Sequence, residues 1–293
     1  MILILGCIIV VGSVLGGFTM AGGHVHALIH PSEVVTIGGA ALGALIMMSP
    51  KKVLIDLMHG ILSAVKGSPY SRPVYTDLFK LMYELMRVIR RDGLLAVESH
   101  LSNPESSSIF KKYPRIVNNH HILSFLCDGF APIVEGTVQD QHKIREMLEA
   151  ELAVMEEEHH AAVGVLQKTA DGLPGFGIVA AVLGIVITMA EINGPVEEIG
   201  HKVGAALVGT FLGILLSYGF FGPLAARMEF LGASEIAFFR TMANMIVACA
   251  ETISPKVVID QCRRGVGSEY RPDRAQMETL FKEAEGSTAE SGA

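Results

Sequence analysis

The sequence predicts an all-α membrane protein with four transmembrane helices in two hairpins and a large helical cytoplasmic loop between spans 2 and 3. Three observations support this fold class. The chain of 293 residues is 50% hydrophobic and only 18% charged, whereas soluble domains have roughly 25% charged residues. Four uncharged apolar runs approach the length of a membrane-spanning helix. The long segment between the second and third runs shows helical periodicity without strand-like alternation.

The four apolar runs define the spans, because about 20 helical residues at 1.5 Å each cross a hydrocarbon core of roughly 30 Å. They cover residues 2–20, 34–48, 173–190 and 203–226, of which the second is the shortest. A secretory signal peptide would start with basic residues, but Met1 leads directly into apolar ones. We therefore expect the first run to be a retained membrane helix.

The positions of lysine and arginine predict the orientation of the chain. The 123-residue stretch from Pro50 to Gly172 holds 14 of the 23 basic residues, and the tail from Arg227 onward holds eight. Basic residues near the ends of spans remain in the cytoplasm, so we expect the loop, the tail and both termini to be cytoplasmic. The short connections 21–33 and 191–202 then lie outside.

Four segments follow from these spans. We expect a first transmembrane hairpin in residues 1–49, a cytoplasmic helical domain in 50–172, a second hairpin in 173–226, and a cytoplasmic helical tail in 227–293 that is disordered toward its end. Residues 265–293 are polar and turn-rich, and we expect them to be flexible. The net charge of −7 gives no concentrated basic face for a phosphate backbone, which argues against a nucleic-acid partner.

The loop is too long to lack structure, and apolar residues recur in it at helical spacing. They are Val74, Leu78, Leu81, Leu85 and Val88. This pattern predicts a helix that ends at Gly93. Arg90 lies roughly 160° around that helix from the start of the stripe, so we expect it to face solvent. A second helix over residues 94–101 carries Glu98 and stops before Asn103, which precedes a proline.

Weakly polar residues follow one face of each of the last two spans. The third span carries Pro174, Ala181 and Thr188, and the fourth carries Thr210, Ser217 and Tyr218. We expect Gly172 and Pro174 to break the helix at the membrane entry. Pro223 removes a hydrogen bond to the carbonyl of Gly219 and is expected at the same membrane depth as Pro174, which suggests a hinge. Alternatively, the hydroxyls bond to their own helices and the prolines only kink them.

None of the four apolar runs contains Asp, Glu, His, Lys or Arg, although proton relays through membranes are normally built on ionisable residues. Either a partner helix brings an acid, or the chain does not conduct ions. Three glycine pairs offer surfaces for close helix contacts. They are Gly12 with Gly16, Gly39 with Gly43, and Gly209 with Gly213.

No pattern in the sequence indicates an enzyme, a cofactor or a metal. Glu156 to His160 are consecutive, so one helix cannot direct them all at one ion, and a solvated face is the better interpretation. His24, His26 and His30 lie on an expected outside loop and are better explained as interfacial polar residues than as ligands. The chain has no catalytic nucleophile motif or phosphate-binding loop, and its four cysteines lack paired spacing.

Several longer motifs resemble the MotA family, the A subunits of the bacterial flagellar stator, over essentially the whole chain. The matching pieces are Gly16–Gly17 and Gly22–Gly23 around the first hairpin, Leu173–Ala181 in the third span, and Val208–Leu216, Tyr218–Phe220 and Pro223–Ala225 in the fourth. Four spans around a large loop also fit. The resemblance implies a proton-conducting, torque-generating subunit in the bacterial inner membrane, embedded in lipid.

The resemblance further implies partners and residue roles. Five copies would surround two MotB-type B subunits, whose spans supply the missing aspartate and whose outer domains bind peptidoglycan. Arg90 and Glu98 would engage a FliG-type switch protein of the rotor. Pro174 and Pro223 would couple ion passage to movement of the loop. Thr210 and Tyr218 would lie near the ion path, and Ala181 stands where sodium-driven relatives carry threonine, which favours protons because sodium prefers oxygen ligands.

Two other functions are weighed against this one. A TolQ- or ExbB-type subunit would use related spans to energise the outer membrane, but it normally has three spans rather than four. A membrane scaffold that moves no ions would fold and remain monomeric without a partner. Four spans and the charged loop favour the stator interpretation.

Overall fold

The computed structural model describes residues 2–138, 140–250 and 253–289, and the regular elements within these ranges are all helical. Four of the helical stretches are long and apolar enough to cross a membrane. They are Ile2–Met20, Val25–Met48, Gln141–Ala190 and Val196–Cys249. The predicted all-α class with four spans, and with a helical segment between spans 2 and 3, is confirmed.

The chain divides into two compact units that are interleaved in sequence. Unit 1 comprises residues 1–67 and 157–232, and unit 2 comprises residues 68–156 and 233–293. Two long helices, α8 (Gln141–Ala190) and α10 (Gly222–Cys249), each contribute to both units.

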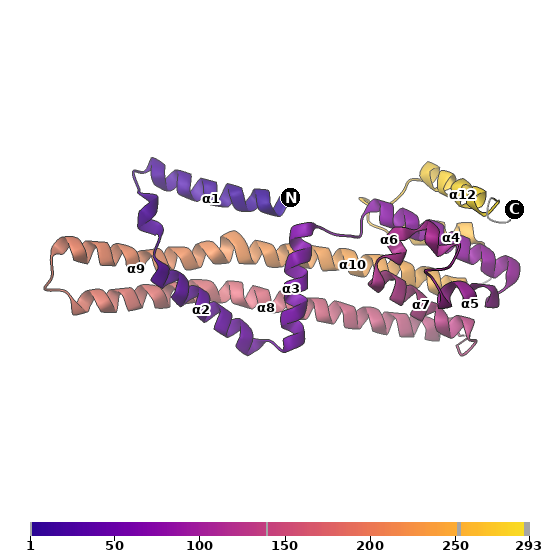
Figure 1. The fold of residues 1–293 in the computed structure, drawn as a ribbon, viewed down its shortest axis with the longest axis horizontal. Coiled ribbons are helices and arrows are strands. Elements are labelled where there is room, and N and C mark those ends of the chain that lie inside the picture. The colour runs from indigo at the N-terminus through magenta and orange to yellow at the C-terminus, as the bar shows by residue number, and fades with distance from the viewer. Residues whose placement is uncertain (1, 139, 251–252, 290–293) are drawn as a thin grey trace. The chain divides into compact units, whose positions relative to one another are not determined.

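Unit 1 contains the first two candidate spans and the apolar parts of the two longer ones, and Figure 1 draws its helices. Besides its shares of α8 and α10, it contains α1 (Ile2–Met20), the 3₁₀ turn η1 (Val25–Leu28), α2 (Pro31–Met48), α3 (Lys51–Lys66), α9 (Val196–Leu216) and the π-helical turn η3 (Ser217–Phe221). Helix α1 buries none of its side chains within the chain, as is usual for a helix whose solvent is lipid.

Glycines allow α8 and α9, which run side by side in Figure 1, to pack closely. A methyl group on Gly177 would lie 2.8 Å from the carbonyl oxygen of Gly209, and one on Gly213 would lie 2.6 Å from that of Leu173. Any larger residue would push the helices apart. The prediction that Gly209 and Gly213 form a close-contact surface is confirmed.

The other two predicted glycine pairs have different surroundings. A methyl group on Gly12 or Gly16 of α1, or on Gly39 or Gly43 of α2, would meet no heavy atom of the described chain within 4 Å. Their part in helix contacts stays a prediction, and any such contact requires another molecule.

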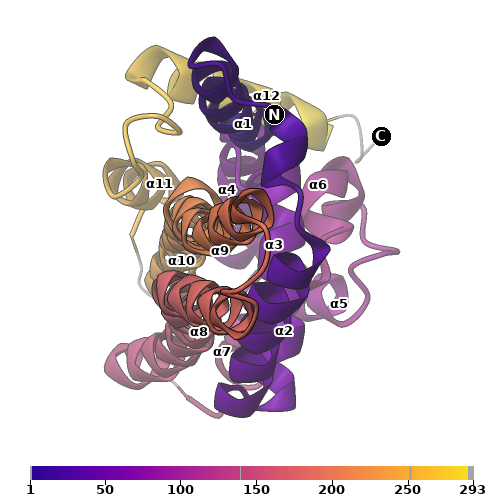
Figure 2. The ribbon, with the colours of Figure 1, turned by 90° about the vertical axis from the view of Figure 1, so that its left-hand side faces the viewer.

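Helix α2 packs against α8 and α9, as Figure 2 shows. Ile37 and Ala41 of α2 form a buried cluster with Leu173 and Ala180 of α8, and apolar side chains of α9 pack onto it. A second cluster in unit 1 joins α3 to α8 and α10 through Leu57, Ala64, Ala162, Val163, Leu166, Ala225 and Met228. These two clusters hold α2, α3, α9 and the unit 1 parts of α8 and α10 together.

The expected break at Gly172 and Pro174 is wrong, because α8 continues through both residues as one helix of 50 residues. A proline inside a helix removes one hydrogen bond, here to the carbonyl of Ala170. Ala170 and Leu173, on either side of the missing bond, are each 1% exposed. Their burial on the neighbouring helices offsets the lost hydrogen bond, so the helix persists.

Unit 2 is built around an aromatic and aliphatic core. Its own elements are α4 (Arg72–Asp92), α5 (Leu95–Ser102), η2 (Phe110–Lys112), α6 (Pro114–Val117), α7 (His120–Val134), α11 (Pro255–Arg264) and α12 (Arg274–Ala289). The first four residues of the predicted stripe on α4 are buried, and Val88 packs against the same core. Phe238 and Phe239 of α10 contact Tyr70, and Phe239 also contacts Phe125 of α7.

The predicted ends of α4 and α5 are confirmed. Gly93 follows α4 with φ of 84° and donates its N–H to the carbonyl of Ile89, a backbone conformation that favours glycine. Helix α5 ends at Ser102, directly before Asn103.

The expected flexibility of residues 265–293 is wrong for most of that segment. Residues 274–289 form α12, which contacts α4 and lies beside it in Figure 1. Met277, Leu280 and Phe281 are buried in the core of unit 2. Helical spacing of these three side chains provides an apolar face that the polar composition of the tail concealed. Residues 290–293 lie outside the described part of the chain.

Candidate functional site

Two of the predicted ion-path residues come together where α8 crosses α9. A methyl group on Gly209 would lie 3.1 Å from Ala180 Cβ and 3.3 Å from the Ala181 nitrogen. Thr210, which follows Gly209, has its Cα 3.3 Å from a methyl group built on Gly177. Ala181 is 8% exposed and Thr210 is half-buried. The structure thus places both residues at one level of the α8–α9 pair.

A carboxyl group lies at the same level, on a residue outside the predicted spans. Helix α2 begins at Pro31, so Glu33 belongs to its first turn. A methyl group on Gly209 would lie 2.5 Å from Glu33 Oε2. Glu33 is 7% exposed. Its Oε2 atom has no hydrogen-bond partner among the described residues.

A signal for this residue was present in the sequence. Proline is favoured in the first turn of a helix, and acidic residues are stabilising there. Pro31 and Glu33 therefore mark the start of α2. The predicted span begins at residue 34, immediately after the charge, and therefore excludes Glu33 from the helix.

The two predicted hinge prolines do not share a depth. The carbonyl oxygen of Leu173, beside Pro174, faces Gly213, and Pro223 lies ten residues beyond Gly213, or about 15 Å along a helix. Ala225, two residues after Pro223, packs instead in the cluster formed with α3 and an earlier part of α8. The expectation of equal depth is wrong because α9 begins at Val196, seven residues before the predicted span.

Pro223 and Tyr218 flank a local change in helix type. The turn η3 is π-helical, and Gly222 donates its N–H to the carbonyl of Ser217 at its end. Such turns alter the direction of side chains and are frequent at functional sites. Tyr218 is 73% exposed and Pro223 is also exposed, so both side chains face outward from the chain.

Arg90 and Glu98 lie in unit 2, and both are exposed. The predicted exposure of Arg90 is confirmed. Arg90 lines a groove of about 310 Å³ between α4 and the start of α11, together with Tyr83, Glu84, Arg87, Val88, Arg91, Ser254, Pro255 and Lys256. Glu98 lies on α5 and does not line this groove.

Charged contacts fix the rim of this groove. Tyr83 donates its hydroxyl to Glu285 Oε1 at 2.7 Å, and Lys256 pairs with the same carboxylate at 3.0 Å. The hydrogen bond from Tyr83 and the ammonium of Lys256 lower the pKa of Glu285. Arg91 pairs with Asp92 at 2.7 Å, and this contact lowers the pKa of Asp92. The rim thus joins α4, α11 and α12.

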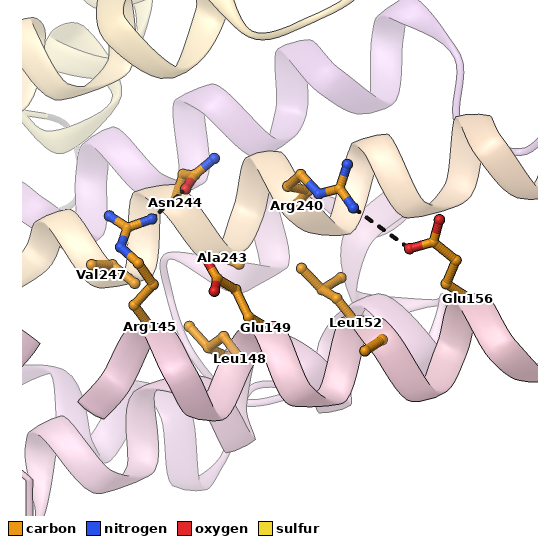
Figure 3. Close-up of a pocket in the computed structure, with 10 residues that line it drawn as sticks. Arg145, Leu148, Glu149, Leu152, Glu156, Arg240, Ala243, Asn244 and Val247 are labelled. Atoms are coloured by element: carbon orange, nitrogen blue, oxygen red, sulfur yellow. Dashed lines mark hydrogen bonds and ion pairs between the residues drawn. The ribbon is translucent and has the colours of Figure 1, made fainter. Parts of the chain in front are cut away.

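A second groove in unit 2, of about 320 Å³, lies between α8 and α10. Figure 3 shows two polar contacts across it: Arg145 with Asn244 at 3.1 Å, and Arg240 with Glu156 at 3.6 Å. Glu149 also lines it. The charges alternate in sign along the groove, so they link the two helices rather than form a single-sign binding surface.

The histidines that end the Glu156–His160 run point toward α10. His159 Nε2 lies 3.1 Å from the carbonyl oxygen of Met228, and the ring covers Gly232. His160 Nδ1 lies 3.3 Å from Glu229 Oε1. The expectation of a solvated face is wrong for His159, which is half-buried and packs one helix against another.

These features define a class: a multi-pass, all-α membrane protein whose spans enclose a buried carboxyl and whose inserted helical segment exposes charged grooves. Residues 4–93 match the family described as motility protein A N-terminal, and residues 118–250 match the MotA/TolQ/ExbB proton channel family. The chain belongs to the MotA family.

Similar proteins agree with this assignment. The chain is 35% identical over 278 residues to motility protein A of Salmonella typhimurium, covering 95% of this chain and 94% of that protein. It is 35% identical over 282 residues to chemotaxis protein LafT of Vibrio parahaemolyticus, covering 96% and 99% of the two chains. Its fold matches a solved structure of C. jejuni MotAB with a TM-score of 0.77 and 22% identity, covering 93% of this chain and 98% of that chain.

Proposed function

We propose that this chain is the A subunit of a proton-driven flagellar stator in the bacterial inner membrane. With a MotB-type partner it conducts protons and converts the proton motive force into torque on the rotor. The observation that carries this proposal is the similarity to motility protein A along 95% of the chain, together with a match to the motility protein A N-terminal family over residues 4–93.

The orientation follows from the basic residues. Unit 2 and both termini lie in the cytoplasm, because Lys and Arg near the ends of spans stay on that side. Residues 1–49 and 173–226 form the membrane hairpins, residues 50–172 form the domain that meets the rotor, and residues 227–293 form a cytoplasmic tail. The connection between α8 and α9 then faces the periplasm.

The ion path runs along the face of unit 1 near Ala181 and Thr210. A partner helix supplies the aspartate that accepts the proton. Ala181 offers no side-chain oxygen at this level, and a hard cation such as sodium requires oxygen ligands. This favours protons as the coupling ion.

Torque arises at the exposed charges of unit 2. Arg90 and Glu98 are of opposite sign and are exposed, so they engage complementary charges on a FliG-type switch protein. One elementary charge crossing 100 mV releases roughly 2.3 kcal/mol, which is several times thermal energy. Each proton can therefore drive one conformational step.

Coupling between the two regions uses the irregular parts of the long helices. Pro174 lacks an N–H within α8, and Pro223 and Tyr218 adjoin the π-helical turn before α10. Both helices contribute to unit 1 and to unit 2. A change of proton occupancy at the path alters the bend of these helices and moves the rotor-facing charges.

The assembly contains several copies of the chain, and a pentamer around two B subunits is the arrangement proposed. The apolar residues of α1 are exposed within the single chain, which suits contacts with lipid and with neighbouring subunits. Open glycines on α1 and α2 offer positions at which helices of other subunits approach closely.

A TolQ- or ExbB-type role is the alternative, since residues 118–250 match a family that includes all three types. The match of residues 4–93 to the motility protein A N-terminal family favours motility.

Complementation tests the proposal directly. In a non-motile strain that lacks its own stator A subunit, expression of this chain with its cognate B subunit restores swimming, and a proton uncoupler abolishes it while changes in external sodium do not affect speed. Restored outer-membrane energisation without swimming would support the alternative. Swimming that follows sodium rather than the proton gradient would contradict the assigned ion.

A further inference from the structure

We propose that Glu33 is a proton-relay residue of this chain, which receives protons from the periplasm and passes them toward the acceptor carboxylate on the partner helix. The inference rests on the proposed function and extends it, because it assigns part of the proton path to the A subunit itself. It is carried by the juxtaposition of the buried Glu33 carboxyl with Gly209, beside Ala181 and Thr210.

Glu33 is only 7% exposed, although glutamate is rarely buried without a partner. Its Oε2 atom finds no hydrogen-bond donor within the described chain. Burying an unpaired polar group is unfavourable, and an ionisable residue within a membrane segment is by default a functional one. Glu33 therefore occupies this position at a cost to stability.

Gly209 has no side chain, and a methyl group there would lie 2.5 Å from Glu33 Oε2. The same methyl group would lie 3.1 Å from Ala180 Cβ and 3.3 Å from the Ala181 nitrogen. Glycine at position 209 thus creates the room that the carboxyl occupies, and it directs that carboxyl to the level of the ion path.

Pro31 and Ser32, the first two residues of α2, are exposed, and Glu33 is buried immediately after them. In the proposed orientation this end of α2 faces the periplasm. The span that contains α2 begins at Val25, so Glu33 lies in the outer half of that span, and its carboxyl is at the level of Ala181.

The proton balance is simple. A hydronium ion outside transfers its proton to the Glu33 carboxylate, forming one O–H bond and leaving water. That O–H bond then breaks as the proton moves, directly or through water, to a carboxylate on the partner helix. Glu33 returns to its carboxylate form. No electron transfer or other reactant is involved.

A purely structural role makes a different prediction. An acidic residue in the first turn of a helix stabilises that helix through the helix dipole. Gln has the length and hydrogen-bonding groups of Glu but cannot release a proton at physiological pH, whereas Asp is shorter but can. A relay therefore tolerates Asp better than Gln, while a role in packing or hydrogen bonding tolerates Gln better than Asp.

The experiment uses the full complex in cells. Rotation speed of motors driven only by this stator is measured for the wild type, Glu33→Gln and Glu33→Asp, and co-purification with the B subunit is measured in parallel. Glu198→Gln is the matched control, because Glu198 also lies in the first turn of a helix of unit 1 but is exposed.

We expect Glu33→Gln to co-purify with the B subunit like the wild type and to lower rotation speed at least about tenfold, while Glu33→Asp and Glu198→Gln retain most of the speed. Normal rotation of Glu33→Gln would overturn the relay. Loss of co-purification in Glu33→Gln would assign a structural role and would also overturn it. If the wild-type chain drove no rotation, the proposed function itself would be wrong.

Discussion

At the scale of single residues, the contact between Gly209 and Glu33 decides how α2 meets the α8–α9 pair. The Gly209 position accepts no additional atom, whereas a methyl group on Gly204 of the same helix would meet no heavy atom of the described chain within 4 Å. Two glycines five residues apart thus have different tolerance to substitution.

Gly209→Ala tests this difference. The new methyl group overlaps Glu33 Oε2 and crowds Ala180, so we expect destabilisation of about 1–3 kcal/mol, the usual cost of overpacking, and a marked loss of motor speed. Gly204→Ala should leave both nearly unchanged. Thermal inactivation of the detergent-solubilised complex and motility in soft agar provide the two measurements. Equal effects of the two substitutions would contradict the close packing at Gly209.

The thiol of Cys127 on α7 is half-buried against the core of unit 2. Burial, with a smaller contribution from Asp128, raises the pKa of this thiol from 9.0 to about 11. Because folding favours the neutral thiol, the stabilisation is complete below pH 9 and is lost as the pH rises toward 11.

Alkylation rates check the prediction for Cys127. Since the thiolate is the nucleophile, we expect Cys127 to react slowly with iodoacetamide at pH 8 in the folded protein and rapidly after unfolding in denaturant. Peptide mass spectrometry over time gives both rates. Rapid modification in the folded state would show that the thiol is not buried as described.

At the scale of helices, the sequence predicts a helix correctly where a single apolar stripe packs against a single core. Helix α4 and its end at Gly93 are predicted correctly, because the apolar residues from Val74 to Val88 keep helical spacing and glycine commonly follows the end of a helix. Helix α12 was missed, because its few apolar residues stand among charged ones and become a buried face only against α4.

The relative alignment of helices could not be predicted. The register of α8 against α9 depends on where α9 begins. Because the first turns of α9 contain polar residues, they do not belong to an uncharged apolar run. For the same reason, a span defined by uncharged residues leaves Glu33 outside α2. Ionisable residues at the ends of spans were therefore the least predictable part of the candidate site.

A buried ionic network connects α4 to the segment that follows α5. Glu84 has a fully buried side chain, pairs with Lys112 at 2.9 Å and accepts a hydrogen bond from the Tyr113 hydroxyl at 2.6 Å. Burial and this hydrogen bond raise the pKa of Tyr113. The carboxylate thus has partners on two sides within the core of unit 2.

Glu84→Ala should be strongly destabilising, by about 3–5 kcal/mol, because it leaves the ammonium of Lys112 without its buried partner. The matched control is Glu283→Ala, which removes an exposed pair with Lys80 and should cost about 0–1 kcal/mol. The difference would appear as a lower thermal midpoint for Glu84→Ala in circular dichroism of the purified protein. Similar midpoints for the two variants would argue that the buried network adds little.

At the scale of the whole molecule, the function depends on the chain working as part of an assembly. In the proposed function, charge on unit 2 acts on the rotor while the Glu33 carboxyl and its surroundings in unit 1 handle protons. The two tasks use different residues, so substitutions should separate them: one group alters coupling to the rotor and the other alters ion flow.

Reversing the two charges that are proposed to face the rotor tests the first task. Arg90→Glu combined with Glu98→Lys should reduce swimming at least about fivefold without changing the amount of chain in the membrane, since both side chains are exposed. Arg274→Glu is the control, because its side chain is 91% exposed and lies on α12. Unchanged swimming of the double variant in tracked cells would exclude these residues from the rotor contact.

The space shared by Glu33 and Gly209 also has an evolutionary consequence. The two positions occupy one volume, so neither can enlarge unless the other shrinks. Among homologues, a residue larger than glycine at position 209 is expected only together with a short side chain at position 33. Such paired changes would show which homologous A subunits have lost the acidic residue at position 33.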